Sequence, residues 1–459
     1  MKFRVSQGII GLSISLLLLL SMIQRVSIPN DYPSSQTPDA IQRNIYADLI
    51  EIDYLGINGN EELLQLAEEH DWPGTGKEWD PIIIEGYYFR NDVHNFVVDN
   101  TDLYWVFKNN VVDGVDGRYC SIVLGNLRNA RISDNVFVRG AVGIHTIRVT
   151  DCEFIRNTMY NLTWDGVLME TSHRNIIMYN TFYDMGEGGV LAWTNCNDNN
   201  IISNVVYNST YGIMLYSGSD SNTIQANKIY DITSIGIEVQ TSDNVILANQ
   251  IHDAGDDGIC ISGFGCEVKR NLVYNTSGYG VHLFSLGGEA LIQNNVLINN
   301  EMGGIQLHYS SGSRIIDNDI IDNGKPQAWD FGNDNVFRHN YWHEWIGNDT
   351  DNNTIIDTPK VIEGGAENTD SHPSLNPINT LPSWYDFVPI TGPPSPEPEP
   401  EPTTTTPETT TTHPVESTTV TSTEPYDPPD TELFVPVVSV TSGILVLFVV
   451  ILLQRRYNN

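Results

Sequence analysis

A unit of about 23 residues is repeated through the middle of the chain, and this repeat restricts the possible fold more than any other feature. Each unit carries an asparagine before a short apolar segment and a glycine before valine or isoleucine. Because the two markers keep a constant phase, they indicate a repeat protein. The asparagines are Asn135, Asn157, Asn180, Asn204, Asn227, Asn249, Asn271, Asn295, Asn318 and Asn340. The glycines are Gly143, Gly166, Gly189, Gly212, Gly236, Gly258, Gly280 and Gly304.

The pattern inside each unit predicts β-strands. After each glycine, apolar residues alternate with other residues, as in Ile213 and Leu215 or Ile259 and Ile261. Alternation with period two indicates a strand with one buried face. The intervening Asn, Asp, Gly, Ser and Thr form turns, and no unit has room for the helix that often accompanies a leucine-rich repeat. The predicted fold class is all-β: a right-handed parallel β-helix, a solenoid of about 11 coils.

The recurring asparagines have a structural explanation. Identical amide side chains that stack in successive coils can hydrogen-bond to one another along the axis. We therefore assign no chemistry to them, and we interpret the recurring glycines as turn residues.

Charge and cysteine content exclude several classes of protein. The chain has 23 Lys and Arg against 58 Asp and Glu, a formal net charge of -35. Such a surface repels the phosphates of nucleic acid, whereas it suits cations and sugars. The five cysteines form no CxxC motif, so neither a zinc site nor a disulfide framework is indicated, although Cys260 and Cys266 could pair.

The two ends of the chain differ in composition from the repeat. Residues 1–26 combine basic residues with an apolar run, which predicts a secretion signal or signal anchor. Residues 392–432, mainly Pro, Thr, Ser and Glu, predict an extended stalk. Residues 433–453 are apolar and long enough to cross a bilayer as a helix, and the arginines of residues 454–459 place that tail in the cytoplasm. We therefore expect a single-pass protein of the cell membrane with an extracellular β-helix.

Between these ends we expect three parts. Residues 27–80 form a linker and a helical cap, residues 81–346 form the β-helix, and residues 347–391 form a second cap with an acidic loop. The first cap contains a short amphipathic helix with Asn60 as its N-cap, which would cover the open edge of the first coil. Sequons for N-glycosylation fit exposure outside the cell. They lie at Asn161, Asn208, Asn275, Asn348 and Asn352.

Two passages resemble a known family. GTGKEWDPIIIEGYYF with FVVDNTDLYWVFKNNVV at the entry (residues 74–89 and 96–112), and NYWHEWIGNDTDNNTIIDTPKVI at the exit (residues 340–362), are similar to the NosD-like right-handed β-helix family of archaeal and bacterial secreted proteins. The resemblance covers residues 39–377 and implies the same fold. It also implies a copper-maturation accessory role as one hypothesis, which requires soft or imidazole ligands close together. His282 and His308 lie in adjacent coils but in different columns, and no Met-rich or Cys-His cluster accompanies them in the sequence.

The exit segment contains a candidate metal loop. Oxygen-bearing side chains there stand at positions 1, 3, 5 and 9 of an EF-hand-like loop, which favours Ca²⁺ as a possible cofactor. Thr354 replaces the expected glycine and Lys360 replaces the bidentate glutamate, so an Asx-rich turn is the alternative. The candidate ligands are Asp349, Asp351, Asn353 and Asp357.

The alternation also predicts outward-facing columns. One column reads His145, Leu168, Leu191, Met214, Glu238, Cys260, His282 and Gln306, and its neighbour reads Glu170, Trp193, Tyr216, Gln240, Ser262, Phe284 and His308. Aromatic rings beside carboxylates and imidazoles are suited to binding sugars. The alternative is that these rings only cover a strand face. The predicted glycan-binding residues are Glu170, Trp193, Tyr216, Glu238, Gln240, His282, Phe284 and His308.

A second resemblance concerns catalysis. GDDGICIS (residues 255–262) and GYGVHLFSLG (residues 278–287) look like the active-site segments of polygalacturonase-type β-helix hydrolases, which implies Asp256 and Asp257 as candidate catalytic carboxylates. Ile235 and Tyr279 stand where that family has a further Asp and a His, so two of its four elements are absent.

These observations favour a membrane-anchored, adhesin-like module that binds a polysaccharide or surface glycan, over an enzyme. The alternative is a polysaccharide lyase, epimerase or glycoside hydrolase that acts on the same face, and the NosD-like copper role is a third hypothesis.

Overall fold

The computed structural model describes residues 49–91, 93–115, 117–284 and 288–383. Contacts divide the chain into two units, Met1–Ser395 and Pro396–Asn459, and all described residues lie in the first. The predicted signal, stalk, membrane helix and tail therefore fall outside the described residues. Within residues 49–383 as described, no helix is long and apolar enough to cross a membrane.

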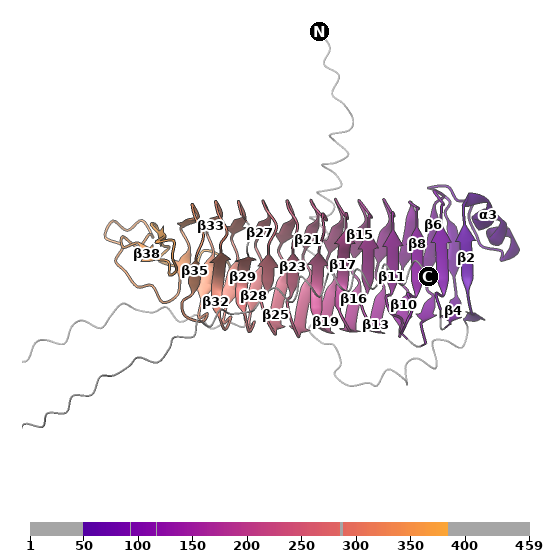
Figure 1. Cartoon of the computed structure of the whole chain (residues 1–459), viewed down its shortest axis with the longest axis horizontal. Coiled ribbons are helices and arrows are strands. Elements are labelled where there is room, and N and C mark those ends of the chain that lie inside the picture. The colour runs from indigo at the N-terminus through magenta and orange to yellow at the C-terminus, as the bar shows by residue number, and fades with distance from the viewer. Residues whose placement is uncertain (1–48, 92, 116, 285–287, 384–459) are drawn as a thin grey trace, which may run out of the picture. The chain divides into compact units, whose positions relative to one another are not determined.

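The described chain winds into the parallel β-helix that the sequence predicts, with three sheets (Figure 1). We name them sheets A, B and C. Successive strands enter sheets B, C and A in turn, so each strand pairs with the strand one coil earlier and one coil later. Strand pairing starts at Ile50, well before the predicted start at residue 81, because short apolar segments before the helix already join sheets A and B.

Sheet A has 13 strands. In order they are β1(Ile50–Ile52), β4(Tyr87–Arg90), β7(Val111–Asp113), β10(Val136–Val138), β13(Thr158–Leu162), β16(Thr181–Met185), β19(Val205–Ser209), β22(Lys228–Ile232), β25(Gln250–Ala254), β28(Leu272–Tyr274), β31(Val296–Ile298), β34(Asp319–Ile321) and β37(Tyr341–Trp342).

Sheet B has 12 strands, and its outer face carries most of the predicted glycan-binding residues. In order they are β2(Leu55–Asn58), β5(Phe96–Asp99), β8(Ile122–Gly125), β11(Ile144–Ile147), β14(Val167–Glu170), β17(Gly188–Thr194), β20(Tyr211–Leu215), β23(Ile237–Val239), β26(Ile259–Ile261), β29(Tyr279–Phe284), β32(Gly303–His308) and β35(Ala328–Asp330).

Sheet C has 14 strands, the last pair antiparallel. In order they are β3(Ile82–Glu85), β6(Trp105–Lys108), β9(Ala130–Ser133), β12(Glu153–Ile155), β15(Ile176–Met178), β18(Asn200–Ile202), β21(Thr223–Gln225), β24(Val245–Leu247), β27(Glu267–Lys269), β30(Leu291–Gln293), β33(Arg314–Ile316), β36(Val336–Arg338), β39(Thr369–Asp370) and β38(Lys360–Val361).

A single helix, α3 (Asn60–Glu69), lies among the described residues beside β2 (Figure 1). Its buried Leu63 and Ala67 belong to the main core cluster. Asn60 is the first helical residue and not the N-cap, because Gly59 occupies that position. The Asn60 side chain instead donates to Asp102 Oδ1 at 2.8 Å, which ties the helix to the following coil.

The core is a stack of inward-facing side chains. The alternating residues that follow each glycine, such as Ile237 and Val239, are fully buried, as predicted. Four of the eight recurring glycines lie in bends directly before sheet B strands, as expected of turn residues, and the other four lie inside these strands. A Cβ on Gly236 would lie 2.6 Å from Ile251 Cγ2 and 2.7 Å from the Gly258 carbonyl oxygen, so this position is restricted to glycine by close packing between coils.

The predicted asparagine ladder is confirmed and joins sheets C and A at every turn. In Asn204, the backbone N–H and Nδ2 both donate to Asn227 Oδ1, at 2.9 and 3.0 Å, and Nδ2 also donates to the Ile177 carbonyl at 2.8 Å. Each buried amide is thus satisfied by the coils before and after it. The ladder extends from Asn110 to Asn340. In Asn340 the backbone N–H and Nδ2 both donate to Asp370 Oδ2.

Replacing Asn204 with alanine should lower the free energy of unfolding by about 2 kcal/mol or more, since it leaves the buried donors of Asn180 without an acceptor. Denaturant titration measures this loss. Thr233→Ala in the next coil is the control, because Thr233 is exposed and lies outside the left-handed backbone region, and it should change the free energy by less than about 0.5 kcal/mol. Equal effects of the two substitutions would contradict the importance of the ladder.

Candidate functional site on the outer face of sheet B

Strand pairing places the first predicted column on sheet B in register. His145 pairs with Leu168, and Cys260 pairs with His282, as do the intervening members. The column is not uniformly exposed, because Leu191 and Met214 are buried on the outer side. His145 at the start of the column is buried as well. Glu238, Cys260 and His282 are partly exposed and lie in three successive coils, so they form the accessible part that carries polar groups.

The second column departs from prediction at one position. The pairing of β14 with β17 shifts after Met169, so Glu170 pairs with Thr194 and not with Trp193. Trp193 is therefore the extra residue of a β-bulge in β17. The Trp193 ring lies edge-on to Tyr216 with centroids 6.1 Å apart, and both side chains are half-buried. Phe284 and His308 pair as predicted.

Asp257 and His282 form a hydrogen-bonded pair in neighbouring coils. Asp257 Oδ2 lies 2.7 Å from His282 Nδ1, while Asp257 Oδ1 accepts from the Tyr279 backbone N–H at 2.7 Å. The Asp257 side chain is buried and that of His282 is nearly so. A proton on Nδ1 satisfies the carboxylate and leaves Nε2 as the basic atom of the ring. Among the described residues, Nε2 has no hydrogen-bond partner although it is shielded from solvent.

Further carboxyl groups surround this pair. Glu238 accepts from the Tyr216 hydroxyl at 2.6 Å and from Gln240 Nε2 at 2.8 Å, which fixes three predicted residues together. Burial and then the neighbouring charge of Asp257 raise the pKa of Asp256. Burial and Glu238 likewise raise the pKa of Tyr216. Asp256 thus holds a proton more readily than an ordinary aspartate.

Aromatic rings continue the face beyond His282. Phe284 lies edge-on to both His282 and His308, with centroids 5.6 and 5.3 Å away. Phe284 is 41% exposed and Tyr309, in contact with His308, is 71% exposed. The sequence analysis does not include Tyr309, which lies outside the two columns, or the stacked rings of Trp329 and Phe331. Trp329 pairs with Gln306 and so continues the first column one coil beyond the last recurring glycine.

Asp257, Cys260 and His282 could also hold a metal ion, since one potential ligand atom from each lies within 4.8 Å of the others. All five cysteines are free thiols. The possible Cys260–Cys266 disulfide is therefore wrong: Cys260 points outward from sheet B, whereas Cys266 is buried in the core.

A second cluster lies nearer the start of sheet B. Cys120 Sγ is 3.8 Å from His145 Nδ1, and His145 Nε2 is 3.1 Å from Glu170 Oε1. Burial alone would lower the pKa of His145, but the hydrogen bonds with Cys120 and Glu170 raise it to about 9. The same contact with His145 lowers the pKa of Glu170. The sequence places His145 and Glu170 in the two outward columns, but it does not indicate Cys120 as their neighbour, because Cys120 precedes the first regular repeat.

The raised pKa of His145 predicts a pH-dependent contribution to stability. A histidine that is charged more readily in the folded state stabilises it fully below the unfolded pKa of about 6.5, and the contribution is lost as pH rises through about 9. The difference in unfolding free energy between the native chain and His145→Gln should be largest at pH 6 and should shrink by pH 9.5. Denaturant titrations at both pH values measure it. A difference that does not vary with pH would contradict the charged pairing.

The predicted calcium loop is closed by its own hydrogen bonds. Asp349 accepts from the backbone N–H groups of Asn353 and Thr354 at 3.0 and 2.8 Å, and Asp357 accepts from Thr350. These contacts are typical of an Asx-rich turn. Asp351 accepts from Asn353 as well. Calcium binding at this loop stays a prediction.

The five sequon asparagines are exposed, and three of them occupy the same position at the end of sheet A strands. These are Asn161, Asn208 and Asn275, each with φ between 50 and 55°. Their glycosylation also stays a prediction.

The outer face of sheet A carries a stack of rings that sequence reasoning missed. Successive centroids lie 4.6–5.2 Å apart and the rings are nearly parallel. Because each ring face is covered by the next ring, this stack offers edges and not flat surfaces to a ligand. Its members are Tyr160, Tyr183, Tyr207, Tyr230, His252 and Tyr274.

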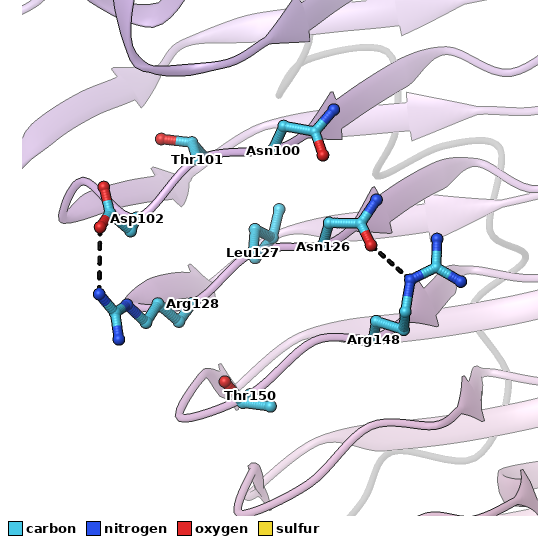
Figure 2. A pocket seen from close by; sticks show the side chains of 8 residues that line it. All are labelled: Asn100, Thr101, Asp102, Asn126, Leu127, Arg128, Arg148 and Thr150. Carbon is cyan, nitrogen blue, oxygen red and sulfur yellow. Dashed lines mark hydrogen bonds and ion pairs between the residues drawn. The ribbon is translucent and has the colours of Figure 1, made fainter.

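A hollow of about 490 Å³ lies at the turns between sheets B and C (Figure 2). Asp102 and Arg128 form an ion pair across it at 3.0 Å, and Arg148 donates to Asn126. The hollow contains none of the predicted site residues, and its one carboxylate is neutralised, so it offers no acid–base pair.

Comparison with known proteins identifies the fold. A family model described as the right handed β-helix region matches residues 94–225, 142–297 and 211–369, which together exceed half of the 459 residues. No curated protein matches this chain.

Similar solved structures include three enzymes. The A-module of the mannuronan C-5 epimerase AlgE4 from Azotobacter vinelandii is 14% identical, covers 66% of this chain and 91% of its own, and has a TM-score of 0.42. The catalytic domain of a GH87 α-1,3-glucanase in complex with nigerose is 13% identical, covers 67% and 68%, and has a TM-score of 0.40. The periplasmic alginate epimerase AlgG is 14% identical, covers 81% and 92%, and has a TM-score of 0.37. At these scores the likenesses transfer no activity to this chain.

Proposed function

We propose a function for this chain, which belongs to the right-handed β-helix family. The outer face of sheet B binds an extended glycan, and Asp257 and His282 transfer protons to and from that glycan. The protein would then be a polysaccharide-processing enzyme. The observation that carries this proposal is the pairing of His282 Nδ1 with Asp257, which leaves the basic Nε2 without a partner among the described residues.

The pair has the geometry of an oriented general base. Asp257 is itself held by the Tyr279 N–H, so its second oxygen fixes the imidazole ring. A shielded, unsatisfied ring nitrogen is costly, and a sugar hydroxyl that donates to it would remove that cost. Phe284, which is partly exposed and lies against the ring, is the side chain that would move to admit the sugar.

Asp256, the residue before Asp257, is a candidate for the acid that would act together with this base. Asp256 carries a raised pKa, so it can keep a proton that a leaving oxygen requires. An Asp–His base with a protonated carboxyl nearby supports proton abstraction or glycosidic cleavage.

The surrounding charges restrict the glycan. Glu238, Asp256 and Asp257 gather within one coil of one another, and the chain has a formal net charge of -35. A polyuronate would be repelled unless cations accompany it. We therefore expect a neutral glycan, stacked on the aromatic rings.

Turnover should depend on the pair itself. Asp257→Asn and His282→Gln in the full-length chain should each lower the release of product from a bound neutral glycan by about 100-fold or more, because they remove the oriented base. Product analysis by mass spectrometry on every glycan that binds an array measures this. The matched control is Asp165→Asn. Asp165 occupies the same position four coils earlier and accepts the Gly188 N–H at 3.0 Å, but its second oxygen orients no histidine among the described contacts.

Two outcomes would contradict the enzymatic proposal. Turnover that survives both substitutions would place the chemistry elsewhere. Glycan binding without any product, in the native chain, would leave a binding module as the function.

Binding without catalysis is the second candidate, and the Trp193–Tyr216 contact favours it. Trp193→Ala should weaken glycan binding about tenfold, because the loss of a stacking ring removes on the order of 1 kcal/mol. Isothermal titration measures this, with Tyr183→Ala on the opposite ring stack as the control. Equal affinities for the native chain and Trp193→Ala would exclude this ring from the binding face.

A further inference from the structure

The Cys120, His145 and Glu170 cluster has no part in the proposed glycan chemistry. His145 and His282 stand in one column, six coils apart, which corresponds to about 29 Å. The two clusters are therefore separate sites on one face.

We propose that Cys120 is a nucleophile for acyl transfer from carboxylic esters to water, with His145 as its acid–base partner and Glu170 as the residue that orients the imidazole. The three side chains come from successive coils: the loop before β8, strand β11 and the end of strand β14. The parallel register that stacks these coils brings the three groups together.

The two ring nitrogens of His145 have different partners. The carboxylate of Glu170 holds Nε2 at 3.1 Å, which fixes the ring plane and turns Nδ1 toward the thiol of Cys120, 3.8 Å away. The thiol thus contacts a base, and the base contacts a carboxylate that orients it. This arrangement activates a cysteine as a nucleophile.

Accessibility also suits the assigned roles. His145 is only 7% exposed, so the imidazole is protected from bulk water, whereas Cys120 is partly exposed and can be reached by a substrate. His94 Nδ1 lies 3.1 Å from the Cys120 carbonyl oxygen and helps to fix the cysteine backbone.

The neighbouring side chains distinguish Cys120 from Cys260. An imidazole in contact with a thiol can take its proton and stabilise the thiolate as an ion pair, and His145 is in such contact with Cys120. For Cys260, burial and the carboxylates Asp257 and Glu238 raise the thiol pKa, which keeps that sulfur protonated. Cys260 is thus an internal control in the same protein.

The chemical step balances with water as the only co-reactant. The Cys120 thiolate attacks the ester carbonyl, a C–S bond forms, and the C–O bond breaks as the leaving alkoxide takes a proton from the His145 imidazolium. Water then attacks the thioester, His145 accepts a proton from it, and the C–S bond breaks to release the carboxylic acid and restore the thiolate–imidazolium pair. Esters are favoured over amides because their carbonyl carbon is more electrophilic and their leaving group is more stable.

Alkylation of the full-length chain tests the activation of the thiol independently of turnover. Limiting iodoacetamide is added between pH 6 and pH 9, and modified cysteines are identified by peptide mass mapping. At pH 6.5 an ordinary thiol of pKa about 8.5 is about 1% ionised. At this pH, Cys120 in the native chain should be alkylated at least about tenfold faster than Cys120 in the His145→Gln variant. The Cys260 peptide should remain almost unmodified.

Glu170→Gln provides a second variant, because Glu170 is partly exposed and its replacement is compatible with the fold even if His145→Gln is not. It should also slow alkylation of Cys120 at pH 6.5 and shift the reaction toward higher pH. A Cys120 that follows the pH profile of a free thiol, unchanged in Glu170→Gln, would overturn the proposal.

The acyl-transfer step is tested with p-nitrophenyl acetate. The native chain should release a burst of nitrophenolate and carry an acetyl group on the Cys120 peptide, and Cys120→Ser should abolish the burst while Cys260→Ser retains it. The assignment of acyl transfer would be overturned if Cys120 carried no acetyl group under conditions in which iodoacetamide alkylates it rapidly. Neither result depends on glycan turnover, so this proposal and the proposed function can fail separately.

Discussion

The asparagine ladder between sheets C and A is the interaction on which the rest of the structure depends. A solenoid must turn sharply in every coil, and each turn would otherwise bury backbone groups without partners. In the ladder one amide accepts from the coil before it and donates to the coil after it, so every buried polar atom at that corner is satisfied. Because the same side chain does this in each coil, the coils stack without slipping in register, and residues about 23 positions apart become neighbours.

This arrangement separates the positions that hold the fold from those that are free to vary. The inward column is restricted to apolar side chains, and the glycine column is restricted by close packing. The outward column on sheet B is less restricted. Leu191 and Met214 are buried in its middle, whereas His145, Glu238, Cys260 and His282 are polar or reactive side chains at other positions of the same column. The side chains of this column can therefore vary in chemistry while the fold stays the same.

The sequence predicts the solenoid and the first column because both follow from a constant spacing. Trp193 could not be placed correctly, since a one-residue bulge after Met169 leaves no mark in the spacing. The local motif indicates Asp257 as a candidate carboxylate and points to position 279 for its histidine partner, whereas the partner is His282. The alternation predicts that His282 faces outward, but it does not show that the ring reaches Asp257 in the preceding coil. Cys120 was missed because it lies in an irregular loop, where no periodicity connects it with the histidine in the next coil.

The amide ladder also has a direction. Every link donates toward the later coil, so the amide dipoles add along the axis in the way that peptide dipoles add along a helix. The donors of Asn340 have no further asparagine to reach, and the carboxylate of Asp370 accepts both of them together with Trp342 Nε1. An anion at the positive end of an aligned row of dipoles is the favourable termination. A solenoid of this kind can therefore be lengthened by inserting whole coils anywhere along the row, but its last coil is chemically distinct from all the others and cannot be exchanged with them.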